Sequence, residues 1–215
     1  YSSMQRFAST NGYIAHELGS IDGYAYTNTA AAFAASYAKG FRLFEADLVM
    51  LGDGTVIAAH NHLERLYGLR KSFHDATAAD LPRMRYRGRY PVLTGQQLLR
   101  LIARHPDVRL LLDTKWSHIG ILEALVHAAG NDRAVLDQLV PHVTDARNIA
   151  AVRAVYPFRG LMLTLYRMPD TLRDADVVAL VRTYHLSAVM FHAADPRTLR
   201  GRDYTAALHR ALAAA

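Results

Sequence analysis

Short apolar runs alternate with helical patterns along the whole chain. The runs typical of strands cover Tyr13–His16, Leu43–Met50, Val56–His60, Val108–Asp113, Gln138–Val143, Leu161–Leu165 and Ala188–His192. Several of them read as continuous apolar stretches, as in a parallel strand that is buried on both faces. The helical patterns cover Thr29–Lys39, Gly95–Arg104, Ile119–Ala129, Ala146–Val155, Asp176–Tyr184 and Asp203–Ala215. This alternation predicts an α/β fold with a mainly parallel sheet.

Capping signals delimit the first two helices. Asn28 is the candidate N-cap of the Ala-rich helix, which stops at Gly40, and Thr94 is the candidate N-cap of the next helix. The segment Glu64–Tyr90 differs from the rest because it is polar and basic and has no clean period. We interpret it as a long excursion over the edge of the sheet where functional loops of α/β folds lie.

Composition is that of an ordinary globular protein. Of the 215 residues, 51% are hydrophobic and 20% are charged, which excludes disorder as the main state. No composition break marks a boundary, so we expect one domain over residues 1–215. Cysteine is absent, which excludes disulfides, thiolate zinc sites and a cysteine nucleophile. No apolar run approaches the roughly 20 residues of a membrane span.

The net charge is +6 and favours anionic partners. Phosphate esters, anionic lipid and nucleic acid are the classes of partner that this charge suggests. The Arg83–Arg89 run is interpreted as a solvated loop face, with contact to a membrane surface as the alternative. Nucleic acid is not expected, because no basic stripe with interleaved aromatic residues is present. The sequence starts at Tyr1 rather than Met, so either a signal peptide has been removed or the sequence is a piece of a longer chain.

Acidic, histidine and lysine residues recur in the predicted strands and where these strands end. They are His16, Glu17, Glu45, Asp47, His60, Asp113, Lys115, His142 and His192, and Tyr166 follows the sixth strand. The carboxyl ends of parallel strands meet at one edge, where α/β folds bind and react. Taken singly, each residue also suits a solvated or structural role. Glu45 and Asp47 are two residues apart on a strand, so both carboxylates share a face, and Mg²⁺ or Ca²⁺ is the natural partner of such oxygen ligands.

The order and spacing of several short motifs match a known family. The motifs are Ile14-Ala15-His16, Thr27-Asn28-Thr29-Ala30-Ala31-Ala32-Phe33, Gly40, Glu45-Ala46-Asp47, Asp53-Gly54-Thr55-Val56, Ala59-His60 and Asp113-Thr114-Lys115. Together they resemble the glycerophosphodiester phosphodiesterase family of the PI-PLC-like phosphodiesterases. The match is close over residues 13–62 and looser over residues 108–116.

The resemblance implies a TIM-barrel-like (β/α)₈ fold and a metal-dependent phosphodiesterase. Its expected partner is a small-molecule phosphodiester substrate, either glycerophosphodiester-like or derived from a phospholipid. It makes His16 and His60 the acid–base pair. It makes Glu45, Asp47 and Asp113 the ligands of a divalent cation, and Lys115 a contact of the phosphate.

The chain departs from the family pattern at three positions. Glu17 stands at the phosphate-binding position where the family has an arginine. A carboxylate there should repel the substrate, unless Glu17 binds metal or turns away. Asn61 replaces an aspartate after His60, and Asp113 replaces a glutamate. A D-x-K without that arginine also occurs in sphingomyelinase D-like phospholipases. The alternatives are therefore such a phospholipase, or an inactive barrel that acts as a binding module.

Seven strand candidates leave a (β/α)₈ barrel without its eighth strand. A barrel with such a gap has two unpaired edges. We expect this defect on the C-terminal side, away from the candidate site at residues 13–115. Alternatively, the gap in the barrel is closed by an N-terminal strand, by a partner chain or by a strand hidden in Glu64–Tyr90.

Overall fold

A curved sheet organises the computed structural model, which describes residues 13–130, 132–165, 173–190 and 206–213. Seven strands are hydrogen-bonded in the order β5-β2-β1-β6-β7-β8-β9. They are β1 Leu43–Met50, β2 Val56–Ala58, β5 Leu93–Thr94, β6 Arg109–Thr114, β7 Leu139–Val143, β8 Met162–Thr164 and β9 Ala188–Met190. The strands from β1 to β9 in this order run parallel, which confirms the predicted α/β fold.

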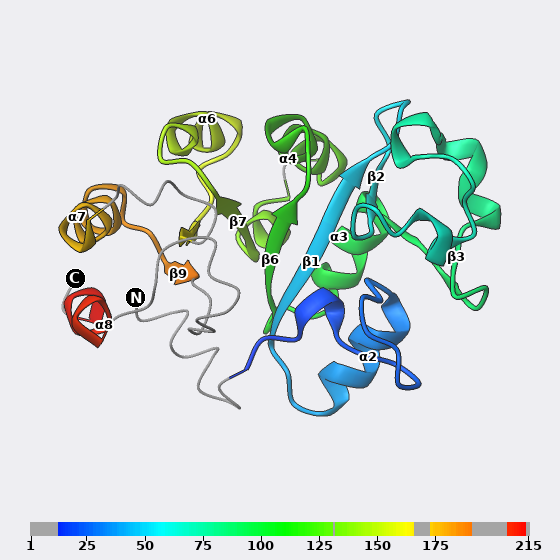
Figure 1. The fold of residues 1–215 in the computed structure, drawn as a ribbon, viewed down its shortest axis with the longest axis horizontal. Helices are drawn as coiled ribbons and strands as arrows, with labels where there is room; N and C mark the ends of the chain where they lie inside the picture. The colour runs from blue at the N-terminus through cyan, green and yellow to red at the C-terminus, as the bar shows by residue number, and fades with distance from the viewer. Residues whose placement is uncertain (1–12, 131, 166–172, 191–205, 214–215) are drawn as a thin grey trace.

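Helices lie around the outside of the sheet, with α4, α6 and α7 following one another along it (Figure 1). The α-helices are α2 Ala30–Ala38, α3 Gly95–Ala103, α4 His118–Ala128, α5 Arg133–Leu136, α6 Asn148–Val155, α7 Asp174–Tyr184 and α8 Ala206–Ala213. Thr94 caps α3 as predicted, because its Oγ1 accepts from the Gln97 N–H at 3.2 Å. Within the described ranges, none of the helices has the length and apolar character needed to cross a membrane.

The two faces of the parallel strands have different environments. On the outer face, side chains such as Phe44 and Leu110 belong to the main core beneath the helices. On the inner face, a small apolar layer is formed by Leu43, Leu111, Val140 and Met162. Because side chains alternate along a strand, the same inner face carries polar residues two positions further on, namely Glu45, Asp113, His142 and Thr164. The interior is therefore apolar at one end of the strands and polar at their carboxyl ends.

Strand β2 runs antiparallel to β1, so the prediction that Val56–His60 ends at the same edge as the parallel strands is wrong. The cause is a tight turn in which Gly54 has a φ of +86° and the Asp53 side chain accepts from the Thr55 N–H at 3.1 Å. An Asp-Gly pair favours such hairpin turns. His60 still reaches the neighbourhood of β1, but it arrives from the opposite direction.

The predicted strand Tyr13–His16 is reduced to a single parallel bridge between Ala15 and Phe44. The chain then forms the one-turn 3₁₀ helix η1 (His16–Leu18), in which Glu17 and Leu18 have φ values of 53° and 61°. Left-handed residues cannot continue a β-ladder. The strand therefore ends where the candidate site begins.

Residues 61–92, here called the insertion, fold over one end of the sheet. They contain η2 (Glu64–Tyr67), η3 (Phe73–Asp75), η4 (Ala78–Arg83) and a hairpin of β3 (Arg85–Tyr86) and β4 (Tyr90–Pro91). The predicted polar excursion therefore has a core of its own, in which Tyr67, Phe73 and Met84 are fully buried against the sheet. Pattern analysis missed this core because short 3₁₀ turns give the apolar residues no single period.

The sheet is TIM-barrel-like but is not closed over the described ranges, where β5 and β9 are its edges. The hairpin of β3 and β4 forms a separate small sheet. A strand hidden in Glu64–Tyr90 therefore does not close the barrel.

We predict that Phe44→Ala lowers the free energy of unfolding by about 3–5 kcal/mol. Phe44 is completely buried, and its ring centroid lies 4.4 Å from that of Phe33 on α2. Urea unfolding followed by circular dichroism measures the loss. The control is Gln96→Ala on the exposed face of α3, which should change the stability by less than about 0.5 kcal/mol. Equal losses in the two variants would contradict the packing described here.

Candidate active site

Three carboxylates, here called the acidic cluster, come from the two central strands. In the parallel register Asp47 pairs with Asp113, and Glu45 lies two residues before Asp47 on the same face. Side-chain oxygens of these three residues lie within 4.8 Å of one another. Glu45, Asp47 and Asp113 are only 3%, 1% and 6% exposed. The face shared by Glu45 and Asp47 is the one predicted from their spacing.

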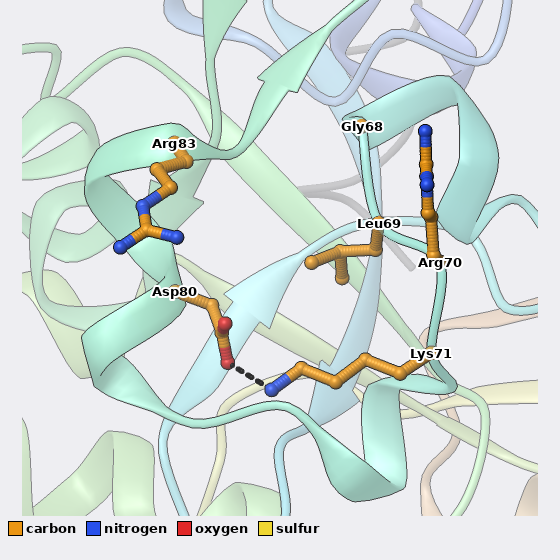
Figure 2. Close-up of a pocket in the computed structure, with 6 residues that line it drawn as sticks. All are labelled: Gly68, Leu69, Arg70, Lys71, Asp80 and Arg83. Carbon is orange, nitrogen blue, oxygen red and sulfur yellow. Dashed lines mark ion pairs between the residues drawn. The ribbon is translucent and has the colours of Figure 1, made fainter.

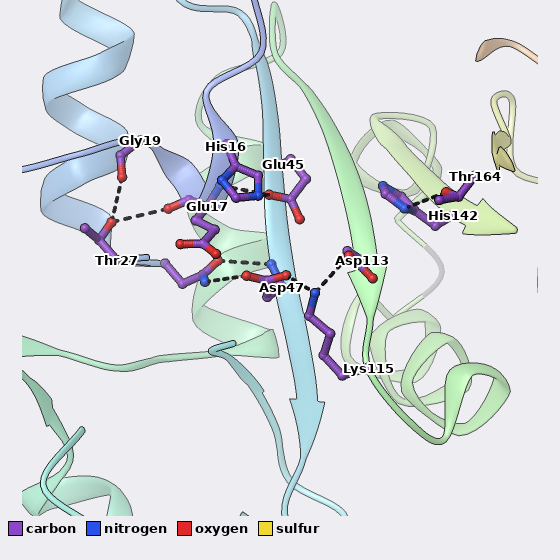
Figure 3. Close-up of polar contacts among 11 residues, drawn as sticks. His16, Glu17, Gly19, Thr27, Glu45, Asp47, Asp113, Lys115, His142 and Thr164 are labelled. Carbon is purple, nitrogen blue, oxygen red and sulfur yellow. Dashed lines mark hydrogen bonds and ion pairs between the residues drawn. The ribbon is translucent and has the colours of Figure 1, made fainter. Parts of the chain in front are cut away.

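Lys115 places an ammonium group between two of these carboxylates (Figure 3). Its Nζ lies 2.5 Å from Asp47 Oδ1 and 2.8 Å from Asp113 Oδ2. Burial lowers the pKa of Lys115, but the two aspartates more than offset this, so its pKa stays above the ordinary 10.5. One ammonium does not balance the cluster. Burial and the charge of Asp47 raise the pKa of Glu45 well above its ordinary value.

Asn28 holds Asp47 by a pair of hydrogen bonds, a role that the sequence analysis missed. Asn28 Nδ2 donates to Asp47 Oδ2 at 3.1 Å, and Asn28 Oδ1 accepts from the Asp47 N–H at 3.0 Å. The predicted N-cap role of Asn28 is wrong, because Thr29 caps α2 by accepting from the Ala32 N–H. Asn28 has a φ of 46°, a conformation that asparagine tolerates better than most residues. An asparagine beside a second good cap residue is the signal that could have indicated this.

Glu17 points into the site rather than turning away from it (Figure 3). Its N–H donates to Glu45 Oε2 at 2.8 Å, and its carbonyl accepts from the Asn28 N–H at 2.9 Å and from Thr27 Oγ1 at 3.2 Å. The residue is 0% exposed. Burial, followed by the negative charge of Asp47, raises the pKa of Glu17 to about 9.

His16 lies at the rim of the site, next to Glu45. Its Nε2 is 3.8 Å from Glu45 Oε2, and its side chain is 71% exposed. The imidazole therefore has access both to solvent and to the acidic cluster.

His60 lies on the other side, near Asp47 and Glu17. A ring nitrogen of His60 and carboxylate oxygens of Asp47 and Glu17 lie within 4.8 Å of one another. The His60 Nδ1 is 2.7 Å from the carbonyl oxygen of Asn61, which suits donation from a protonated Nδ1. In that tautomer, the lone pair of Nε2 is left available.

A polar pocket of about 390 Å³ adjoins the acidic cluster. Its lining residues are Asp113, Thr114, Lys115, Trp116, Ser117, His118, His142, Thr144 and Asn148. His142, one of the residues at predicted strand ends, lines this pocket, and its Nδ1 lies 3.1 Å from Thr164 Oγ1. Tyr166 and His192, which also fall at or after predicted strand ends, lie outside the described residues.

His118 is a pocket residue that the sequence analysis did not single out. It begins α4, and its Nδ1 is 2.5 Å from Thr114 Oγ1. Burial lowers its pKa below the ordinary 6.5, which favours the neutral imidazole at neutral pH. The sequence indicates its place in the pocket only through its position, three residues after Lys115.

A second hollow of about 300 Å³ lies on the insertion and is lined by Gly68, Leu69, Arg70, Lys71, Asp80 and Arg83 (Figure 2). Lys71 pairs with Asp80 at 2.7 Å. None of the predicted site residues lines it. Arg83, Arg87 and Arg89 are exposed, as expected for a solvated loop face.

Comparison with known proteins identifies the family of the chain. Residues 19–193 match the sequence profile of the Glycerophosphoryl diester phosphodiesterase family. The chain belongs to this family. The match confirms the resemblance found in the motifs and makes the protein a phosphoric diester hydrolase of this type. The matched range begins after His16 and Glu17 and contains the other predicted site residues.

Solved structures of this family share the fold at low sequence identity. A protein from Agrobacterium tumefaciens with this family's name has a TM-score of 0.68 at 15% identity, covering 94% of this chain and 80% of that one. One from Galdieria sulphuraria has a TM-score of 0.67 at 17% identity, covering 82% and 72%. A phosphodiesterase from Oleispira antarctica, in complex with the product sn-glycerol-3-phosphate, has a TM-score of 0.55 at 14% identity, covering 84% of each chain.

The acidic cluster fits the divalent cation that the resemblance implies. Its donors are all carboxylate oxygens, the ligands that Mg²⁺ and Ca²⁺ prefer. Around a cation with metal–oxygen distances of about 2.1 Å, opposite ligands of an octahedron are about 4.2 Å apart. The oxygens of the cluster lie within 4.8 Å of one another, which is compatible with this spacing.

We predict that Glu17→Gln stabilises the metal-free protein, and that the gain grows as the pH rises. The native pKa of about 9 lies above the ordinary 4.5, so the folded protein retains a proton that the unfolded chain has released. Between these two values wild-type stability therefore falls with rising pH, whereas the glutamine variant has no such proton to lose. Urea unfolding in EDTA at about pH 5 and about pH 8 measures the difference.

The control for this prediction is Glu123→Gln, which removes an exposed carboxylate from α4. A stability difference between wild type and Glu17→Gln that stays constant with pH would contradict the prediction.

Proposed function

We propose that the protein is a metal-dependent glycerophosphodiester phosphodiesterase in which His16 and His60 exchange protons with the substrate. The observation that carries the proposal is the buried acidic cluster with Lys115 beside it and a histidine on either side. A phosphodiester is an anion with a poor alkoxide leaving group. Its hydrolysis therefore needs positive charge at the phosphoryl oxygens and proton transfer at the leaving oxygen.

Glu45, Asp47 and Asp113 would hold the divalent cation. When bound, the cation supplies Lewis acidity and neutralises the phosphoryl group. Lys115 adds a fixed ammonium at the Asp113 side, where the polar pocket begins. Without added positive charge, the buried carboxylates would repel an anionic substrate.

The two histidines suit opposite halves of the reaction. One takes a proton from the attacking hydroxyl, and the other gives a proton to the leaving oxygen. His16 lies on the Glu45 side and His60 on the Asp47 side, so they flank the acidic cluster. Imidazole suits both steps because it gains and loses protons near neutral pH.

The polar pocket is placed to bind the alcohol part of the substrate. Hydroxyl, amide and imidazole groups of Thr114, Ser117, His118 and Asn148 offer hydrogen bonds to a polyol. The product bound to the Oleispira antarctica relative is a phosphorylated glycerol. We extend this substrate class to the present chain.

The second candidate function is a phospholipase of the sphingomyelinase D-like type. An exposed aromatic side chain near the site favours it, since Tyr26 is 51% exposed. The Tyr26 ring centroid is 6.2 Å from that of His60. Such a ring would contact an acyl chain or a membrane surface.

We predict cation-dependent hydrolysis of glycerophosphocholine that EDTA abolishes and Mg²⁺, Ca²⁺ or Mn²⁺ restores. Asp113→Asn should lower kcat/KM by about 10²–10³-fold, the scale of losing one electrostatic group at a transition state. Release of glycerol phosphate is the assay. Faster turnover of lysophosphatidylcholine would favour the phospholipase. No turnover of either substrate with any of the cations would leave only the binding module.

We predict that His16→Ala lowers kcat by about 10²–10⁴-fold, the usual contribution of general acid–base catalysis. Because His16 is largely exposed, its loss should change the free energy of unfolding by less than about 0.5 kcal/mol. The matched control is His127→Ala, an exposed histidine on α4. A His16→Ala enzyme with near wild-type kcat would exclude the proposed role.

A further inference from the structure

We infer that Glu17, Asp47 and His60 form a second, weaker cation site whose filling inhibits the enzyme. The inference rests on the proposed function for the first cation, at the acidic cluster. The second site uses two residues outside that cluster and shares Asp47 with it. Its expected ligand is a transition cation such as Mn²⁺ or Zn²⁺.

The geometry brings three suitable donors together. One oxygen from each of Glu17 and Asp47 and one ring nitrogen of His60 lie within 4.8 Å of one another. Asp47 has two carboxylate oxygens, so it can bridge this site and the acidic cluster. An imidazole among the donors favours Mn²⁺ or Zn²⁺ over Ca²⁺ or Mg²⁺, which prefer oxygen.

The carboxylate of Glu17 is an independent sign of a ligand. It is fully buried, and no hydrogen-bond donor reaches either of its oxygens from the described residues. Buried carboxylate oxygens without donors are costly. Hydrogen bonds with Glu45 and Thr27 fix the backbone of Glu17, and its side chain is directed toward Asp47 (Figure 3). A cation would satisfy these oxygens where they lie.

Charge in the interior points the same way. Within the residues that the structure describes, four carboxylates including Glu17 surround the ammonium of Lys115, so with all of them ionised this set carries three net negative charges. One divalent cation leaves one negative charge. Because the half-filled site is still negative, its electrostatic field attracts a second cation, which then makes the net charge positive.

Filling this site removes a catalytic group. His60 Nδ1 faces the carbonyl oxygen of Asn61, which leaves Nε2 for either a proton or a cation. A cation bound there takes the lone pair that the proposed reaction needs. Sharing Asp47 with the first cation makes the second one bind more weakly. Activity should therefore rise and then fall as Mn²⁺ is added.

Titration with Mn²⁺ followed by electron paramagnetic resonance tests the inference. The full chain should bind two ions, and the second should produce the spectrum of an exchange-coupled pair, because Asp47 bridges them. Glu17→Gln should bind one ion and should lose the inhibition at high Mn²⁺. In wild type, that inhibition should reach about tenfold or more, since acid–base transfer by one histidine is worth about 10²–10⁴-fold.

Three variants complete the test. His60→Ala, checked for folding by circular dichroism, should also bind one ion. Glu123→Gln makes the same chemical change as Glu17→Gln at an exposed position and should bind two. Asp113→Asn weakens the first site, so the tighter of the two binding steps should move to higher Mn²⁺ concentration.

The possible failures are distinguishable. If the wild-type protein binds one ion and Asp113→Asn binds none, the second site is overturned and the proposed function is kept. Binding of two ions by Glu17→Gln would overturn the assigned ligands of the second site. Binding of two ions without exchange coupling by the wild-type protein would do the same. Absence of both Mn²⁺ binding and hydrolysis overturns the second site together with the proposed function.

Discussion

The parallel register of β1 and β6 makes Asp47 face Asp113 inside the sheet, and the rest of the site follows from that constraint. Two buried carboxylates at this spacing repel each other strongly, because the interior screens charge poorly. The chain relieves part of the repulsion with the ammonium of Lys115, which contacts both. It adds a third carboxylate, Glu45, on the same face. Among the described residues the cluster therefore keeps an excess of negative charge, which external cations or retained protons can balance.

The backbone near β1 is shaped around these carboxylates. Glu17, Leu18 and Asn28 all have positive φ, a conformation that typically costs about 1–3 kcal/mol at non-glycine residues. In return, the Glu17 N–H reaches Glu45, and the Asn28 amide holds both the side chain and the N–H of Asp47. Positions that are locally unfavourable but fixed by buried hydrogen bonds are typical of functional sites. The orientation of the carboxylates is thus set before any cation arrives.

Sequence patterns predicted the features that depend on strand periodicity and order. The spacing of Glu45 and Asp47 was enough to place them on one face, and the strand pattern brought Asp113 beside them. Features set by single turns were beyond such patterns. The reversal of β2 depends on one Asp-Gly turn, so the prediction was right about the neighbourhood of His60 but wrong about its direction of approach. The role of Asn28 depends on tertiary hydrogen bonds that a good capping residue conceals, and the buried core of the insertion has no period to detect.

Glu17 shows how one residue can change the charge balance of a site without changing its fold. The family pattern has an arginine at this position, and a cation there would add positive charge beside the substrate. Glutamate reverses that charge, yet the backbone bonds of Glu17 depend only on its N–H and carbonyl, so they tolerate the exchange. Under the proposed function, the site then gains positive charge from a cation bound from solution. With the two proposed cations, both substrate attraction and the state of His60 would depend on dissolved cations. The activity would then follow the cation concentration, which a fixed arginine would not bring about.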